Sequence, residues 1–86
     1  MSTNALEKAL WQIGTSPAEC TRYRSDPAAY ATDFRLDAGE RKALAELDVG
    51  AMARRDTSTL LLMMAFLAVR GPDSMGEYMQ SMHRPA

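Results

Sequence analysis

Apolar residues near the start of the chain repeat with the spacing of one helical face. They stand at positions i, i+3, i+4 and i+7, as Leu6, Ala9, Leu10 and Ile13. This is the pattern of an amphipathic helix with one buried side. Ser2 and Thr3 precede the run as candidate caps, and Gly14 follows it as a candidate stop. The pattern predicts a helix over about residues 4–14.

The next helix starts are marked by capping side chains followed by proline or glutamate. They are Ser16-Pro17-Ala18-Glu19, Asp26-Pro27 and Asp37-Ala38-Gly39-Glu40. Proline suits the first helical position, and a glutamate at the third position can complete a capping box. These signals predict helices over about 17–24 and 38–47, and a further helix that starts at Asp26-Pro27. Between them, Tyr30 and Phe34 are expected to pack together at i, i+4, and Asp48 is expected to begin a short turn over 49–54.

The strongest helix signal covers residues 59–70. Several capping candidates precede it, and Gly71 with Pro72 ends it. A last helix over about 74–82 follows, with Asp73 or Ser74 as its cap. Because no segment alternates with period two and no Asn-Gly hairpin signal occurs, the expected fold is all-α. We predict one compact domain over residues 1–86, built from five or six short helices.

The helix over 59–70 is apolar on nearly every side, unlike the other predicted helices. Such a helix lies at the centre of a domain or between two chains. The other helices are short and apolar on one side only, so they offer too little cover for it. This mismatch predicts a partner, with the apolar excess either inside the domain or at an interface.

Composition and charge exclude several classes of protein. The chain has 86 residues, 47% of them hydrophobic and 24% charged, which is ordinary for a globular domain. Its formal net charge of −1 lacks the positive excess of a nucleic-acid binder. The longest apolar run is ten residues, from Leu60 to Val69, whereas a membrane span needs about 20. A single cysteine and charges in place of a signal-peptide core predict a cytoplasmic protein.

Few side chains are available for metal binding or catalysis. The one histidine, His83, lies close to the end of the chain, whereas zinc and non-haem iron sites need several Cys, His or carboxylate ligands. We therefore expect no metal, no cofactor and no catalytic residue in this chain. Cys20 is expected to pack as a small hydrophobe. Asp73-Ser74-Met75 resembles a phosphopantetheine site, but a plain helix cap explains Ser74.

Some residues are better suited to contact with another protein. Trp11 lies one position off the apolar face of its helix, as an interface anchor or a partly buried surface residue. Met75, Met79 and Met82 follow each other at helical spacing, either as a core face or as an adaptable binding face. The residues that we predict to contact a partner are Trp11, Tyr30, Met63, Phe66, Met75 and Tyr78. Arg54, Arg55 and Arg70 are expected to be solvated at helix ends, or less plausibly to meet an anionic ligand.

The order of these signals resembles a known family. Tyr23 precedes Asp26 by three residues, Ala29-Tyr30 follows, and then come Leu36, Asp37 to Arg41, and Asp48 with Met52. The leucine-rich helix, Gly71, and Ser74 leading to Met79 and Met82 complete the series. Over about residues 6–82 the chain resembles the small (alpha, LigA-type) subunit of the protocatechuate 4,5-dioxygenase family of extradiol ring-cleaving enzymes.

The resemblance implies a non-catalytic role beside a larger enzyme subunit. In that family the large beta subunit holds Fe(II), and the small all-helical subunit covers the mouth of its active site. Helix 59–70 and the turn before it would be the covering elements, with Arg55, Thr57 and Ser58 as possible contacts at the substrate mouth. The family often has a glycine-containing turn there, which this sequence lacks. That departure puts any substrate contact from this turn in doubt.

Other functions remain open at the level of sequence. Two copies of the chain could bury their apolar helices against each other, as a homodimeric interaction module without dioxygenase activity. The family also includes stand-alone small proteins with no demonstrated catalytic partner. DNA-binding regulation agrees with short helices but not with the charge balance.

Overall fold

The computed structural model describes residues 2–82, with the side chains of residues 4–82. Seven helices form in this part of the chain, and no strand does. They are α1 (Ser2–Thr15), α2 (Pro17–Ser25), α3 (Pro27–Ala31), α4 (Ala38–Glu46), α5 (Val49–Ala53), α6 (Thr59–Arg70) and α7 (Met75–Met82). The predicted all-α fold is confirmed. There is one helix more than the expected five or six, because α5 is a short helix where the sequence indicated a turn.

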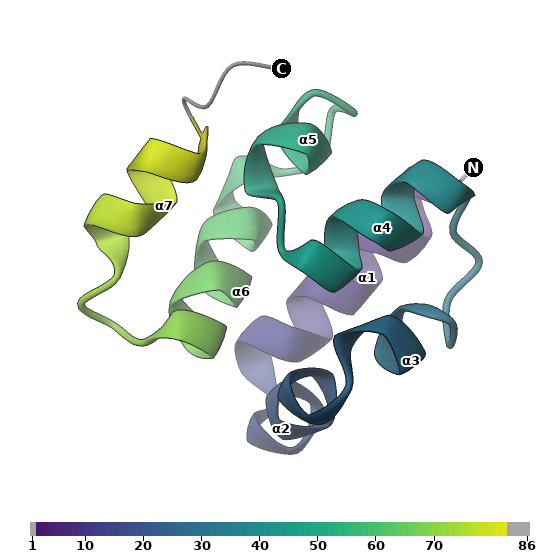
Figure 1. The fold of residues 1–86 in the computed structure, drawn as a ribbon, viewed down its shortest axis with the longest axis horizontal. Coiled ribbons are helices and arrows are strands. Elements are labelled where there is room, and N and C mark those ends of the chain that lie inside the picture. The colour runs from purple at the N-terminus through teal and green to yellow at the C-terminus, as the bar shows by residue number, and fades with distance from the viewer. Residues whose placement is uncertain (1, 83–86) are drawn as a thin grey trace.

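The longest two helices, α1 and α6, lie beside each other and carry the rest of the domain (Figure 1). They run in the same direction. Near their starts, the Ser58 backbone N–H donates to Glu7 Oε2 at 2.8 Å. Further along, a Cβ added at Gly14 would lie 3.2 Å from Met64 Cβ. Gly14 therefore lets the two helices approach closely, and α1 continues past it to Thr15 rather than ending there.

The core is formed by the inward sides of these two helices and by the helices that cover them. Its largest fully buried side chains come from α1, α4, α5 and α6: Leu6, Leu10, Ile13, Leu44, Val49, Met52 and Leu62. Burying each such side chain stabilises the fold by about 1.5–3 kcal/mol. The row that predicted the first helix, which begins with Leu6, is buried as expected.

Capping side chains begin five of the helices where the sequence indicated. Asp37 forms a complete capping box, in which Asp37 Oδ1 accepts from the Glu40 backbone N–H at 2.8 Å and Glu40 Oε1 accepts from the Asp37 N–H at 3.1 Å. Ser16, Asp26, Asp48 and Ser58 each accept from a backbone N–H in the same way. The expected caps Ser2 and Thr3 have side chains outside the described part of the chain.

Two of the expected caps behave differently from the prediction. Glu19 does not complete the box at Ser16, because its carboxylate lies against Arg22 and the Tyr30 hydroxyl. Ser74 precedes α7, but its hydroxyl donates back to the Gly71 carbonyl at 2.6 Å. Glu19 thus bonds to side chains outside the capping box, and Ser74 bonds to a residue that precedes it. The capping rules applied to the sequence include neither contact.

The ends of α4 and α6 show how left-handed backbone stops a helix. Gly71 ends α6 with φ of 107°, a conformation that glycine adopts without a steric penalty. Leu47 ends α4 with φ of 53°, which is unusual for a residue with a Cβ. Its side chain is buried in the core. Packing of the Leu47 side chain therefore offsets the conformational free energy of its positive φ. The sequence did not predict this conformation.

An aromatic cluster joins α2, α3 and the segment after α3. The rings of Tyr23 and Tyr30 meet edge to face at 5.8 Å between centroids, and Tyr30 and Phe34 pack at 5.4 Å, as predicted. The Tyr23 hydroxyl donates to the Leu44 carbonyl at 2.6 Å. Burial raises the pKa of Tyr23 to about 12. The cluster thus ties α2 to the end of α4 through a buried hydrogen bond.

Leu62 and Leu60 provide a matched test of this packing. Leu62 is fully buried and Leu60 is 60% exposed on the same helix. We expect Leu62→Ala to lower the free energy of unfolding by about 3 kcal/mol because it leaves a cavity. Leu60→Ala should change it by less than about 0.5 kcal/mol. Urea unfolding followed by circular dichroism measures both, and equal losses would contradict the described orientation of α6.

Tyr23 predicts how stability changes at high pH. The folded pKa is raised from about 10, so the contribution of Tyr23 is fully present below pH 10 and is lost as pH rises towards 12. We expect Tyr23→Phe to destabilise the protein by about 1 kcal/mol at neutral pH, because it removes the bond to Leu44. As pH rises through the alkaline range, the free energy of unfolding of the variant should then fall by about 2 kcal/mol less than that of the parent. Urea midpoints at about pH 8 and about pH 11.5 measure this difference, and parallel pH profiles would show that Tyr23 does not titrate as described.

Candidate interaction surface

One side of α6 is buried and the opposite side is left uncovered. The inward side consists of Leu62, Ala65 and Phe66. Since successive residues turn by about 100°, Leu60, Met64 and Leu67 lie on the opposite side of the helix. Leu60 is exposed, and Met64 and Leu67 are half-buried. The apolar excess of α6 is thus partly core and partly surface.

Trp11 extends this uncovered side across α1. Its side chain is 55% exposed. Trp11 lies between two contacts that join the parallel helices. One is the hydrogen bond from Ser58 to Glu7, and the other is the close contact of Gly14 with Met64. Trp11 therefore lies beside the stretch of α6 that begins at Leu60. This exposed position fits both sequence predictions, an interface anchor and a partly buried surface residue.

Two methionines of α7 lie on the other flank of α6. The Tyr78 hydroxyl donates to the Thr59 carbonyl at 3.2 Å, and the rings of Tyr78 and Phe66 meet at 5.6 Å between centroids. These contacts fix α7 beside α6. Met75 and Met79, which are 41% and 47% exposed, follow each other on the outer side of α7. Met82 instead packs partly buried against the core.

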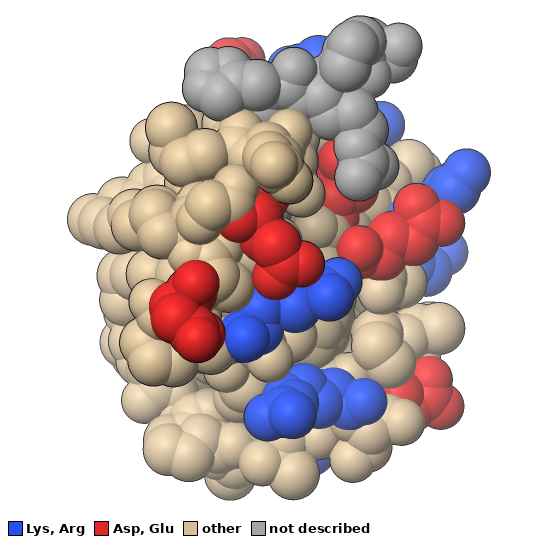
Figure 2. All heavy atoms as spheres, turned by 60° about the vertical axis from the view of Figure 1, so that its left-hand side comes forward, with Lys and Arg blue, Asp and Glu red and all other residues tan. Residues whose placement is uncertain are grey.

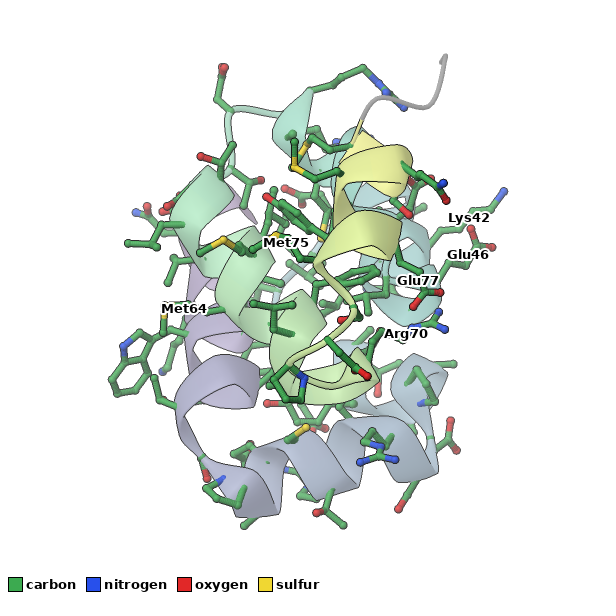
Figure 3. All side chains as sticks on the ribbon, turned by 90° about the vertical axis from the view of Figure 1, so that its left-hand side faces the viewer. Lys42, Glu46, Met64, Arg70, Met75 and Glu77 are labelled. Atoms are coloured by element: carbon green, nitrogen blue, oxygen red, sulfur yellow. The ribbon has the colours of Figure 1, made fainter. Side chains whose placement is uncertain are left out.

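These side chains form one apolar surface, which we call the α6 face. Its members are Trp11, Leu60, Met64, Leu67, Met75 and Met79. Figure 3 shows Met64 at the edge of the molecule opposite Lys42, Glu46 and Glu77, with Arg70 near those charges. In Figure 2 the left-hand edge of the molecule is formed by side chains other than Lys, Arg, Asp and Glu. Met64 thus lies on a different side of the domain from these labelled charges.

Three residues predicted to contact a partner lie in the core instead. Tyr30, Phe66 and Tyr78 are buried among the other core side chains. The Tyr30 hydroxyl lies 3.0 Å from Glu19 Oε1, and burial and this hydrogen bond raise its pKa. Burial also raises the pKa of Tyr78. Their aromatic rings fill space between helices of the same chain, so they are not available at the surface. Met63 is partly buried against the core.

The sequence did not single out Leu60, Met64 or Leu67. Because nearly every position of α6 is apolar, its pattern does not indicate which side faces outward. Which side of α6 faces the core is decided by the side chains that pack against Leu62, Ala65 and Phe66. Those side chains come from distant parts of the chain. Trp11 in α1 and the row of methionines in α7 did carry a sequence signal for their parts of the surface.

The turn before α6 uses its side chains within the domain. Arg55 makes an exposed ion pair with Asp37 at 3.3 Å, and the Glu40 backbone N–H, assisted by Arg55, lowers the pKa of Asp37. Ser58 caps α6, with its Oγ 3.4 Å from the Leu61 backbone nitrogen. Thr57 is only 4% exposed. The expected substrate-mouth contacts therefore have internal roles, and Thr57 does not reach the surface.

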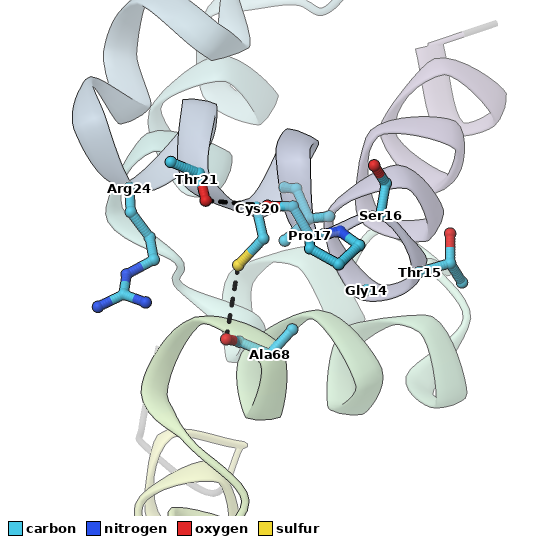
Figure 4. Close-up of a pocket in the computed structure, with 9 residues that line it drawn as sticks. Gly14, Thr15, Ser16, Pro17, Cys20, Thr21, Arg24 and Ala68 are labelled. Atoms are coloured by element: carbon cyan, nitrogen blue, oxygen red, sulfur yellow. Dashed lines mark hydrogen bonds between the residues drawn. The ribbon is translucent and has the colours of Figure 1, made fainter.

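Cys20 borders a cavity of about 350 Å³ between the end of α1, the start of α2 and α6 (Figure 4). Its thiol is buried, with Sγ 3.5 Å from the Ala68 carbonyl oxygen. Arg24 is the charged member of the lining, and no carboxylate or imidazole lies among the described residues there. Without a base to activate the thiol, the arrangement fits a packing role for Cys20.

The remaining candidates divide between helix ends and the undescribed terminus. Arg70 ends α6, where its guanidinium carbon lies 5.8 Å from the centre of the Phe66 ring. A positive charge is favourable at the negative end of a helix dipole. Ser74 is buried and bonded to Gly71, so its hydroxyl is not presented for modification. His83 lies outside the described residues.

Comparisons with known proteins do not assign this chain to a family. No family model, curated protein or solved structure matches it. Within residues 2–82, no helix is long and apolar enough to cross a membrane. The same part of the chain contains no group of three His, Cys, Asp or Glu side chains placed to hold a metal ion.

Thr57 supplies a test of the turn. Its buried Oγ1 has no hydrogen-bond partner among the described residues. We expect Thr57→Val, which keeps the shape and removes the hydroxyl, to raise the free energy of unfolding by about 1–2 kcal/mol. Thr57→Ser keeps the hydroxyl and removes the methyl group, so it should lower stability. Chemical denaturation distinguishes the two, and a destabilised Val variant would show that the hydroxyl has a bound partner.

Proposed function

We propose that this chain is a non-catalytic small subunit, or a stand-alone relative of one, of an extradiol ring-cleaving dioxygenase that acts on a protocatechuate-type acid. The observation that carries the proposal is the α6 face, an apolar surface built from side chains of three helices, because the largest apolar patch of a small domain is often its binding site. The sequence resemblance supplies the kind of partner, a larger cytoplasmic subunit that holds Fe(II).

The role of the chain in this proposal is structural. The α6 face packs against the large subunit, with Trp11 as an anchor of large contact area. Covering the mouth of the partner's active site excludes water from the reacting aromatic acid. This chain contributes no metal ligand and no catalytic group to the complex.

The test is direct association with an extradiol large subunit of the protocatechuate type. Light scattering of the mixture should give a complex of defined mass, and ring cleavage with Fe(II) should rise when the chain is added. Trp11→Ala should weaken the complex by at least about 30-fold, because an interface tryptophan is commonly a hot spot.

Ala28→Glu is the matched control, since Ala28 is exposed on α3, away from α6 and α7 (Figure 1). It should leave association unchanged. The proposal fails if the chain alters neither the mass nor the ring-cleavage activity of the large subunit.

A further inference from the structure

The α6 face is uncharged over its whole extent. None of its six members is titratable, and α6 carries no charged residue before Arg70. Two such faces brought together would therefore add no charge of their own to the contact, and burying unpaired or like charges is a main penalty of association.

The size of the face decides whether a second copy could hold to it. Trp11, Leu60, Met75 and Met79 each expose roughly half of their surface, which is about 100 Å² per side chain. With the half-buried Met64 and Leu67, the α6 face offers about 500 Å². Two copies would bury about 1,000 Å² in total, the lower limit for a specific protein–protein interface.

The shape of the face also suits symmetric pairing. Its centre is one side of a single twelve-residue helix, which is about 18 Å long. Trp11 flanks this helix on one side, and Met75 and Met79 flank it on the other. A two-fold axis near Met64 would lay α6 against its own copy and close the contact without leaving a second apolar surface.

We propose that the chain by itself forms a reversible homodimer through the α6 face. This inference concerns the isolated chain and does not depend on the proposed function. An interface at the lower size limit is typical of weak, transient association. The dimer therefore dissociates within the range of ordinary laboratory concentrations.

Sedimentation equilibrium of the full chain from about 1 μM to about 1 mM tests the proposal. The expected result is a monomer–dimer transition. Leu60→Glu should raise the dissociation constant by at least about 30-fold, since the symmetric contact would bury the new charge twice. Ala28→Glu adds the same charge away from the α6 face and should leave the transition in place.

A second variant locates the axis without altering charge. Met64→Cys should form a disulfide between two chains on mild oxidation, while Lys42→Cys, on a different side of the molecule from Met64, should not. A chain that stays monomeric up to about 1 mM overturns the proposal. A dimer that survives Leu60→Glu and is not trapped by Met64→Cys overturns the assignment to the α6 face. Because the proposed large subunit would use the same face, its addition should dissociate the homodimer; binding to the large subunit is measured separately and does not require that the isolated chain dimerise.

Discussion

The parallel packing of α1 along α6 is the contact on which the other helices depend. Gly14 allows the two backbones to approach at Met64, and Glu7 accepts from the backbone N–H of Ser58, the N-cap residue of α6. A carboxylate near the positive end of a helix is favourable electrostatically as well as through the hydrogen bond. Once α1 and α6 are joined, their inward sides form the floor on which α4, α5 and α7 pack.

Polar side chains then fix the short helices, which would not be stable by themselves. The capping box at Asp37 and the caps at Asp26 and Asp48 satisfy backbone groups at the helix starts. The Tyr23 and Tyr78 hydroxyls reach carbonyls of distant helices. These hydrogen bonds satisfy the hydroxyl groups of the buried tyrosines. Tyr78, which is suited to an interface, can therefore lie inside the domain.

The α6 face is a consequence of the small size of the domain. A domain of 86 residues has a high ratio of surface to volume, and its short helices cover one side of α6 while leaving the other to solvent. Both proposals place a partner on the α6 face, either a larger enzyme subunit or a second copy of the chain. The reason is that association would remove its exposed apolar surface from water.

The sequence by itself determined the all-α class, most helix starts and the buried row of α1, because capping and helical periodicity act over a few neighbouring residues. It did not determine which side of α6 faces outward, since a helix that is apolar on every side has no phase of its own. It also did not indicate the left-handed Leu47 or the burial of Phe66 and Tyr78. Those features depend on contacts between segments far apart in the chain, so only the tertiary structure decided them.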